Sequence, residues 1–358
     1  MVMNEKLKCI IKRLVKTIPF FEHLYQTYSI LHLRNVRVHQ NYIEGRQCFE
    51  KKKPQNGSWR DYKYALNKYL VSYSEYMHQY EFWHLNEIQR HEFISRLEMR
   101  LLYEKIVPLA VRHVFWNKAT FLKKFSSFIH RRWLVAREAS IDDFCDLVSS
   151  SDCIAKPIEG TLGQGIFKIT KGTVDIDSLY HKCVENDLLI EERILNEESI
   201  SLFHRNSLNT IRLVTCLRTG VLGSFIRFGR HGNIVDNAHA GGIFAQIDTN
   251  TGMIESEGID TEGRRFIKHP DSNVPIKGFV IPRWSEIVDT CKAAHSIMPD
   301  APIVGWDICI DSNNNIEIIE GNHMPDVDVM QSPLKIGIRT KVETLFAGKA
   351  AFSKSRKK

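Results

Sequence analysis

One segment near the C-terminal end, IVGWDICIDSNNNIEIIEGN, places two apolar runs on either side of an Asn-rich turn. This pattern predicts two antiparallel strands joined as a β-hairpin. If Asn313 and Asn314 are the two turn residues, Asp307 lies directly opposite Glu320. Because the side chains of a strand alternate between its two faces, Asn322 then lies on the same face as these acids.

Two carboxylates that face each other across a strand pair repel, and they would destabilise the hairpin unless a positive charge lies between them. Mg²⁺ prefers hard oxygen ligands, usually one or two carboxylates together with substrate phosphates and water. The face formed by Asp307, Glu320 and Asn322 therefore predicts a magnesium site. The alternative is a solvated hairpin whose acids never meet, because a slip of one residue in register would separate them.

The size and composition of the chain are those of a soluble globular protein. It has 358 residues, 43% hydrophobic and 25% charged, which is enough for two or three structural units. No apolar run approaches the roughly 18 residues that a membrane-spanning helix needs. Lysines and arginines interrupt the first apolar patches, so a signal peptide is not expected, and we expect a cytoplasmic protein. The eight cysteines form no CxxC pair, which argues against a disulfide framework or a zinc site.

Positive charge is concentrated at the two ends of the chain. Residues 1–136 carry 24 Lys and Arg against 11 Asp and Glu, whereas residues 137–348 carry 20 against 31. Residues 5–30 also show the spacing of a basic amphipathic helix, which Pro19 should kink or end. Such features are compatible with peripheral contact with an anionic membrane surface or an acidic polymer, but solubility and packing of the helix on its own domain are the commoner outcomes. The sequence shows no RNA-binding signature, so nucleic acid is not an expected partner.

The organisation of the chain changes near residue 150. The polar stretch 51–60 reads as a loop, and residues 61–115 read as two or three helices. From there on, short β-like runs alternate with glycine-containing turns, and helical patches interrupt them at 176–186 and 283–297. The predicted strands lie within residues 153–158, 165–169, 188–194, 209–217, 223–229 and 241–248. The mixture predicts an α+β fold with antiparallel sheets.

A glycine loop follows Lys156 at the end of one predicted strand. Gly160, Gly163 and Gly165 lead directly into the next strand. Without side chains, such a loop can lie close over a polyphosphate and offer it free backbone N–H groups. A Rossmann or P-loop site would need a helix after the glycines. Lys156 can hold phosphates as a point charge, or it is an exposed structural lysine.

Five separated motifs occur in the order typical of a known superfamily. They are Lys118 in NKATF, Lys156 with its glycine loop, the run LLIEERI with Glu198 shortly after it, and the two strands of the final hairpin. In this order the chain resembles the ATP-grasp superfamily. The segments SLNTIRLVT, RFGRHGNIVDNAHAGGI, VGWDICI and IEGNHMPDVDVMQ resemble the sugar-transfer-associated ATP-grasp family. That family is found with polysaccharide biosynthesis and is related to glutamate-ligase-like enzymes.

The resemblance covers about residues 115–345 and implies an ATP-grasp fold, in which two α+β subdomains with antiparallel sheets grip ATP behind a helical N-terminal region. The ranges that we expect are 1–115 for a basic helical region, 116–200 for the small subdomain with the glycine loop, 201–345 for the large subdomain with the metal site, and 346–358 for a basic tail.

The resemblance also implies roles for single residues. Lys118 and Lys156 match the lysines that contact the nucleotide phosphates, and residues 160–165 match the loop that closes over them. At the hinge between the subdomains, Glu191, Glu192 and Ile194 match the residues that bind adenine. Glu198 matches the acid on the ribose hydroxyls. Asp307, Glu320 and Asn322 match the magnesium ligands, so the implied cofactors are ATP and Mg²⁺.

One departure concerns substrate binding. In D-alanine ligases an arginine lies two residues before the first metal aspartate, and here that position is Gly305. Arg212, Arg227 and Arg230 are candidate replacements, since a guanidinium can bind a carboxylate or a γ-phosphate through two parallel hydrogen bonds. We expect Arg212, Arg230 and Lys156 to be catalytic. Further candidates for an acceptor pocket are Asp236, Asn237, His239, Asp326 and Asp328.

The implied activity is an ATP-dependent carboxylate–amine ligase that forms an amide through an acyl phosphate. Its expected substrates are a small-molecule carboxylate and an amine, sugar-linked or lipid-linked, in surface polysaccharide biosynthesis. One alternative is an ATP-grasp-type kinase that phosphorylates a hydroxyl. Another is a non-catalytic protein that binds a membrane or an acidic polymer through its basic ends.

Overall fold

The computed structural model describes residues 19–51, 54–160, 165–173, 175–217, 220–232 and 241–346, with side chains described from residue 27 onward. The chain forms two compact units. The first comprises Met1–Val107 and Lys335–Lys358, and the second comprises Pro108–Leu334. Every strand of the described residues belongs to the second unit.

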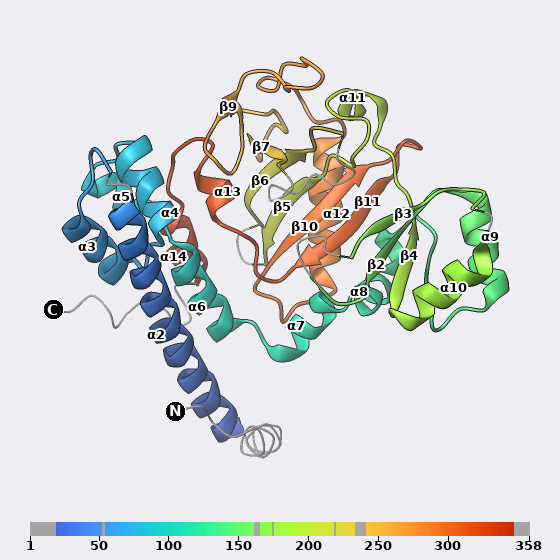
Figure 1. Ribbon diagram of the computed structural model, residues 1–358, viewed down its shortest axis with the longest axis horizontal. Coiled ribbons are helices and arrows are strands. Elements are labelled where there is room, and N and C mark those ends of the chain that lie inside the picture. Colours follow the sequence, from blue (N-terminus) through green and yellow to red (C-terminus); the bar gives the residue numbers. More distant parts are fainter. Residues whose placement is uncertain are drawn as a thin grey trace. The chain divides into compact units, whose positions relative to one another are not determined.

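The first unit is helical. Its elements are α2 (Pro19–Lys51), α3 (Trp59–Tyr69), α4 (Tyr73–Tyr76), the π-helical turn η1 (Met77–Phe82), α5 (Glu87–Glu92), α6 (Arg96–Ile106) and α14 (Arg339–Phe346), as Figure 1 shows. The described part of α2 starts at Pro19, so the earlier part of the expected helix, and with it the expected kink or end at Pro19, lies outside the described residues. Aromatic rings around the buried Tyr62 and Tyr76, whose centroids are 5.3 Å apart, form the core.

The prediction of two or three helices over residues 61–115 was wrong, because the helices are shorter and more numerous. Three of them begin with a capping box, in which the side chains of the first and fourth residues bond to each other's backbone N–H. The boxes start at Ser72, Asn86 and Ser95. Each box satisfies the free N–H groups of a new helix and so favours a separate start over continuation of the previous one.

A buried arginine holds the C-terminal helix within the first unit. The guanidinium of Arg339 donates to both carboxylate oxygens of Glu98, at 3.0 and 2.6 Å, and to the carbonyls of His91 and Phe93. Its side chain is 2% exposed. Residues from Lys335 onward thus belong with the N-terminal helices, whereas the sequence placed 201–345 in one range.

The second unit contains a small antiparallel sheet in the strand order β1-β4-β2-β3. Its strands are β1 (Trp133–Val135), β2 (Cys153–Pro157), β3 (Phe167–Ile169) and β4 (Leu188–Glu192). Helices α9 (Ile141–Ser150) and α10 (Ile176–Glu185) lie beside this sheet in both ribbon views. Their apolar side chains, including Phe144 and Leu147, form one core with the strands.

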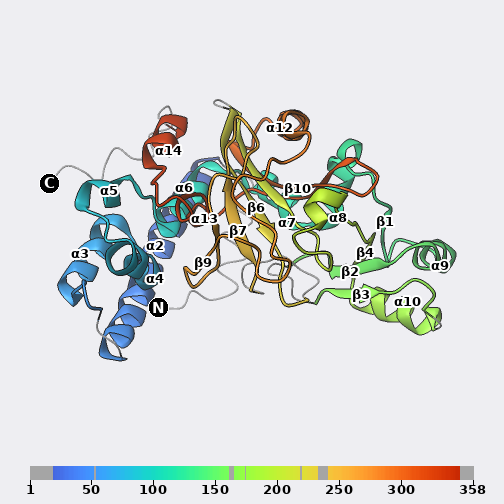
Figure 2. The ribbon, with the colours of Figure 1, turned by 90° about the horizontal axis from the view of Figure 1, so that it is seen from above.

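A seven-stranded antiparallel sheet forms the rest of the second unit, in the order β11-β10-β5-β6-β7-β8-β9. The strands are β5 (Ile211–Cys216), β6 (Gly220–Phe228), β7 (Ile243–Ile247), β8 (Gly258–Ile259), β9 (Arg265–Phe266), β10 (Ile303–Ile310) and β11 (Ile316–Asn322). Helix α12 (Trp284–Ser296) packs against β5, β10 and β11. In the view of Figure 2 its ribbon does not overlap the strands. The other helices are α7 (Leu109–Trp116), α8 (Lys118–Lys124), η2 (Ser126–Phe128), α11 (Glu198–Ser201) and α13 (Asp328–Gln331). These two sheets confirm the predicted α+β fold with antiparallel strands.

The final hairpin forms as expected, but its turn is different. Asp311 and Asn315 close the turn through the Asp311 N–H, which donates to the Asn315 carbonyl at 2.9 Å, and Asn314 adopts a left-handed conformation with φ 65°. The turn is one residue longer than expected, so the strand pairs nearest to it are shifted by one residue from the expected register. A β-bulge then leaves Ile319 unpaired and restores the expected pairing of Asp307 with Glu320.

Within the described residues, no helix is long and apolar enough to cross a membrane. Five of the cysteines, at positions 153, 183, 216, 291 and 309, are buried.

Candidate active site

Asp307 lies in the middle of β10, between the neighbouring strands β5 and β11. It pairs with Arg212 on one side and with Glu320 on the other. The Arg212 guanidinium binds both carboxylate oxygens of Asp307, with the second contact at 2.8 Å, and Arg227 donates to the same carboxylate at 2.9 Å. Two arginines that are distant in sequence thus converge on one buried carboxylate.

Gly305 provides room for this arrangement. A Cβ atom at this position would lie 3.1 Å from the Arg212 side chain and 2.9 Å from Pro325. The arginine that D-alanine ligases carry at this place in the strand is absent here, and a guanidinium from the adjoining strand lies beside it. The structure therefore brings Arg212 and Arg227 to the face that the sequence assigned to the metal.

The two facing acids differ in charge state. Burial disfavours ionisation of Asp307, but the charges of Arg212 and Arg227 outweigh it and hold the pKa of Asp307 well below its usual range. Burial and the negative charge of Asp307 raise the pKa of Glu320, which shares a hydrogen bond with Asp307. The arginines thus favour the charged form of Asp307, and burial beside Asp307 favours the protonated form of Glu320.

The donor atoms suit a hard cation. Two carboxylates face each other, and the Asn322 side-chain oxygen, which accepts from the Met324 N–H at 2.8 Å, keeps a second lone pair. No group of three or more His, Cys, Asp or Glu side chains with metal-binding spacing occurs among the described residues. The set at Asp307, Glu320 and Asn322 therefore matches the ligands that Mg²⁺ takes together with substrate phosphates rather than a closed protein cage.

Lys118 and Lys156 lie together beside this acidic face. The Lys118 ammonium donates to the carbonyls of Pro157 and Gly160, at 3.0 and 3.1 Å. Burial and the nearby charge of Lys156 lower the pKa of Lys118, and Glu320 is close enough to act in the opposite direction. Two lysines from α8 and β2 and a carboxylate from β11 are thus in electrostatic contact.

Glu191 on β4 forms a buried ion pair with Lys156. The same carboxylate accepts from Arg131 at 2.9 and 2.6 Å. Burial disfavours its charged form, but Arg131 and Lys156 lower the pKa of Glu191 to about 2. Its carboxylate is therefore occupied by two cations, and its expected role in binding adenine stays a prediction.

Arg131 is a functional candidate that the sequence did not reveal. It lies in the loop between η2 and β1 and binds Glu191 in the small sheet and Glu317 in the final hairpin. These partners are 60 and 186 residues away along the chain. No local pattern marks such a residue, because a lone arginine in a polar loop is normally exposed.

Among the other predicted nucleotide contacts, Gly160 accepts a hydrogen bond from Lys118 through its carbonyl. Gly160 and Gly165 have positive φ values of 131° and 73°, which glycine tolerates best, and Gly163 lies outside the described residues. Glu192 accepts from the Ser151 hydroxyl at 2.7 Å. Ile194 is half-buried and Glu198 is exposed in the first turn of α11.

Arg230 has different partners from Arg212 and Arg227. Its guanidinium binds the Gly241 carbonyl and Asp260, and lies over the ring of Phe266. Its expected catalytic role stays a prediction. The acceptor candidates Asp236, Asn237 and His239 lie outside the described residues. Asp326 and Asp328 follow the metal face, and the Asp326 carboxylate accepts from the Asp328 N–H at 3.0 Å.

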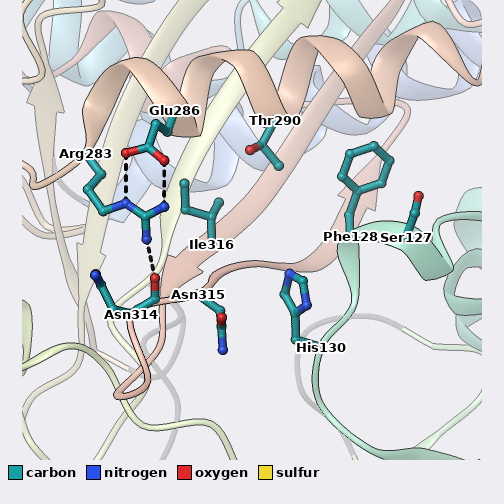
Figure 3. A pocket seen from close by; sticks show the side chains of 9 residues that line it. All are labelled: Ser127, Phe128, His130, Arg283, Glu286, Thr290, Asn314, Asn315 and Ile316. Atoms are coloured by element: carbon teal, nitrogen blue, oxygen red, sulfur yellow. Dashed lines mark hydrogen bonds and ion pairs between the residues drawn. The ribbon is translucent and has the colours of Figure 1, made fainter.

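A pocket of about 300 Å³ lies at the turn end of the hairpin, away from the acidic face. Figure 3 shows the ion pair of Arg283 with Glu286 and the bond from Arg283 to the Asn314 carbonyl on one side of it. His130 and Phe128 lie on the opposite side. None of the nine lining residues is a predicted site residue.

Several solved structures are similar to this chain at low sequence identity. No curated protein matches the sequence. The solved ATP-grasp ligase PsnB, complexed with minimal precursor, is 13% identical over 70% of this chain and 69% of its own, with a TM-score of 0.43. The D-alanine–D-alanine ligase from Bacillus anthracis is 11% identical over 69% and 68%, with a TM-score of 0.39. The D-cycloserine synthetase DcsG is 9% identical over 70% and 77%, with a TM-score of 0.42.

The family described as sugar-transfer associated ATP-grasp matches residues 127–345. This range contains both sheets and all the proposed site residues apart from Lys118. Because the match spans more than half of the chain, the protein belongs to the sugar-transfer-associated ATP-grasp family.

Proposed function

We propose that this ATP-grasp protein is an ATP-dependent carboxylate–amine ligase. The observation that carries the proposal is the convergence of two lysines, two arginines and two facing carboxylates on one part of the second unit. A substrate carboxylate oxygen attacks the γ-phosphorus and ADP leaves, which gives an acyl phosphate. An amine then attacks the acyl carbon, phosphate leaves, and the nitrogen loses one proton.

The nucleotide is proposed to bind along β2 and β4. Lys156 and Lys118 hold its phosphates, and the glycine loop at residues 160–165 covers them and excludes water. The backbone between Glu191 and Ile194 binds the adenine edge, and Glu198 binds the ribose. Asp307, Glu320 and Asn322 would hold Mg²⁺, which would neutralise charge on the phosphates.

Arg212 and Arg227 are proposed to bind the transferred phosphoryl group and the substrate carboxylate. In the ligand-free chain both guanidiniums are held by Asp307, which keeps them aligned beside the acids. An anionic substrate offers an equivalent acceptor and releases Asp307 for the cation. Positioned donors of this kind stabilise the charge that develops in the transition state without reorganisation.

A uronic acid or amino sugar of a surface polysaccharide, or its lipid-linked precursor, is the proposed substrate, joined to an amino acid. The family description, sugar-transfer associated, supports this class. The basic excess of the N-terminal region supports a location at the inner face of a membrane, where lipid-linked sugars are presented.

A product assay tests the proposal. Purified protein is incubated with ATP, Mg²⁺ and a panel of uronic acids crossed with amino acids, and phosphate, ADP and the organic product are measured. The ligase forms free phosphate and an amide in equal amounts. A phosphoester without free phosphate would identify a kinase instead. Salt-dependent binding to anionic vesicles without any nucleotide binding would identify a non-catalytic module.

A further inference from the structure

We infer that Arg131 is a positioning residue that holds the phosphate-binding lysine and the metal-binding hairpin in register with each other. This inference rests on the proposed nucleotide site, and it assigns a role to a residue outside all the motifs that identify the site. Arg131 belongs to the loop before β1, and its partners belong to β4 and β11.

Every N–H group of the Arg131 guanidinium has an acceptor. On one side, Nε and Nη2 donate to Glu191 at 2.9 and 2.6 Å. On the other side, Nη1 donates to Glu317 at 2.5 Å and to the Ile318 carbonyl at 2.9 Å, and Nη2 also donates to the Ile319 carbonyl at 3.0 Å. The side chain is 3% exposed. Arg131 therefore acts through its partners and does not touch the substrate.

The contact with Ile319 concerns the metal face directly. Ile319 is the extra residue of the β-bulge. If the strands paired without a bulge, Ile319 would lie opposite Asp307 and the Glu320 side chain would point to the other face of the sheet. A bulge weakens the ladder locally, so its carbonyl needs another donor. Arg131 supplies that donor and thereby fixes the pairing of Glu320 with Asp307.

The contact with Glu191 concerns the nucleotide phosphates. Glu191 accepts from Arg131 through Oε1 and pairs with Lys156 through Oε2. With Arg131 in place, the positive charges of Arg131 and Lys156 balance the negative charges of Glu191 and Glu317. Without it, Lys156 is the remaining cation for a buried carboxylate, which binds the lysine more tightly and makes it less available to a phosphate.

Glu317 anchors the arrangement to the hairpin. Its carboxylate accepts from the His130 N–H at 2.7 Å as well as from Arg131, and it is buried. The loop that carries Arg131 is thus tied by backbone and side chain to β11. The small sheet and the final hairpin share one buried junction, and Arg131 is the residue common to both sides.

The test is Arg131→Lys, which keeps the charge but cannot make all five hydrogen bonds of the guanidinium at once. Calorimetry measures the affinity for ADP without metal and the gain in affinity on adding Mg²⁺. Because residues that orient metal ligands typically contribute about 10–100-fold in metal affinity, we expect the Mg²⁺-dependent gain to fall by about 10-fold or more. Metal-free ADP affinity should fall less, because the retained positive charge still balances part of the charge of Glu191.

Arg339→Lys is the matched control. Arg339 is equally buried and binds a carboxylate and two carbonyls, but it lies in the first unit. Both substitutions should lower the melting temperature, whereas only Arg131→Lys should change nucleotide affinity and its magnesium dependence. A folded Arg131→Lys variant with wild-type values for both would overturn the inference.

Glu317→Gln covers the case in which Arg131→Lys does not fold. It removes the charge that anchors Arg131 to the hairpin while Glu191 and Lys156 remain. The Mg²⁺-dependent gain should fall more than the metal-free affinity does, and an unchanged gain would overturn the role at the bulge. Absence of ADP binding by the wild-type protein would contradict the proposed function itself, so the two failures are distinguishable.

Discussion

Two buried arginines, one in each unit, have different kinds of partners. In the first unit, Arg339 takes both oxygens of Glu98 and two backbone carbonyls. In the second, Arg131 takes one oxygen of Glu191, whose other oxygen is paired with Lys156. The first arrangement is closed among its own residues. The second leaves a cation that a ligand phosphate can attract, so a similar side chain serves stability in one unit and a binding site in the other.

The largest expected effect concerns the second unit, which holds the proposed binding site. Glu320→Gln removes one of two facing carboxylates and should lower magnesium-dependent turnover by at least about 100-fold. The melting temperature should not fall, because burial and Asp307 already disfavour the charged form of Glu320. The measurement is phosphate release across a range of Mg²⁺ concentrations. Normal turnover at limiting Mg²⁺ would remove Glu320 from the metal site.

Lys156→Ala tests whether the lysine paired with Glu191 also binds a nucleotide phosphate. Arg131 still binds Glu191 in this variant, so the fold should persist, while one phosphate contact is lost. We expect nucleotide affinity to fall by about 10-fold, since a charge-assisted contact contributes on the order of 1.5–3 kcal/mol. Calorimetric titration with ADP measures it, with Arg339→Lys as the control. Unchanged affinity would count against the phosphate role of Lys156.

Arg339→Met tests the closed arrangement. It leaves Glu98 and two carbonyls without their donor, and breaking a buried pair in this way typically costs about 3–5 kcal/mol. Urea unfolding should show a loss of this size, and nucleotide affinity should stay at the wild-type value. A variant as stable as the wild type would show that the contacts of Arg339 do not hold α14 within the first unit.

A further expected effect is a pH dependence of stability. Although burial disfavours its charged form, the Arg131 and Lys156 charges hold the pKa of Glu191 at about 2 in the folded chain, below its ordinary value of about 4.5. A depressed pKa contributes stability above the unfolded-state value, and that contribution is lost as pH falls from about 4.5 towards 2. Glu191→Gln should therefore unfold with a shallower pH dependence in this window, by on the order of 3 kcal/mol. Acid titration followed by circular dichroism measures the slope, and a wild-type slope would contradict the charge state assigned to Glu191.

The sequence predicted the pairing of Asp307 with Glu320 from a turn that does not exist. The predicted turn at Asn313 and Asn314 was too short by one residue, and the bulge at Ile319 offset that difference. Alternating polarity cannot reveal a bulge, because the extra residue is itself apolar. The α+β class, the family and most of the strands were predictable because apolar runs and motif order are written locally along the chain. The short strands β1, β8 and β9 were not predicted.

The partners of the charged residues were not predictable. Arg131 and its partner Glu317 are 186 positions apart in the sequence, and Arg227 and its partner Asp307 are 80 positions apart. The contact of Arg131 depends on how the small sheet and the final hairpin meet, and the contact of Arg227 depends on which strands become neighbours in one sheet. No periodicity in the sequence encodes either arrangement. The absence of an arginine at Gly305 was visible in the sequence, whereas the space that it gives to Arg212 became visible only in the packing.

The most direct test of the account is the thermodynamic coupling between nucleotide and magnesium. ADP is titrated calorimetrically into the wild type and into Glu320→Gln, each with and without Mg²⁺. A single site formed by the lysines and the facing acids predicts that Mg²⁺ tightens binding to the wild type, and that Glu320→Gln loses this gain while it keeps its metal-free affinity. Failure of the wild type to bind ADP, or an undiminished magnesium gain in Glu320→Gln, would contradict it.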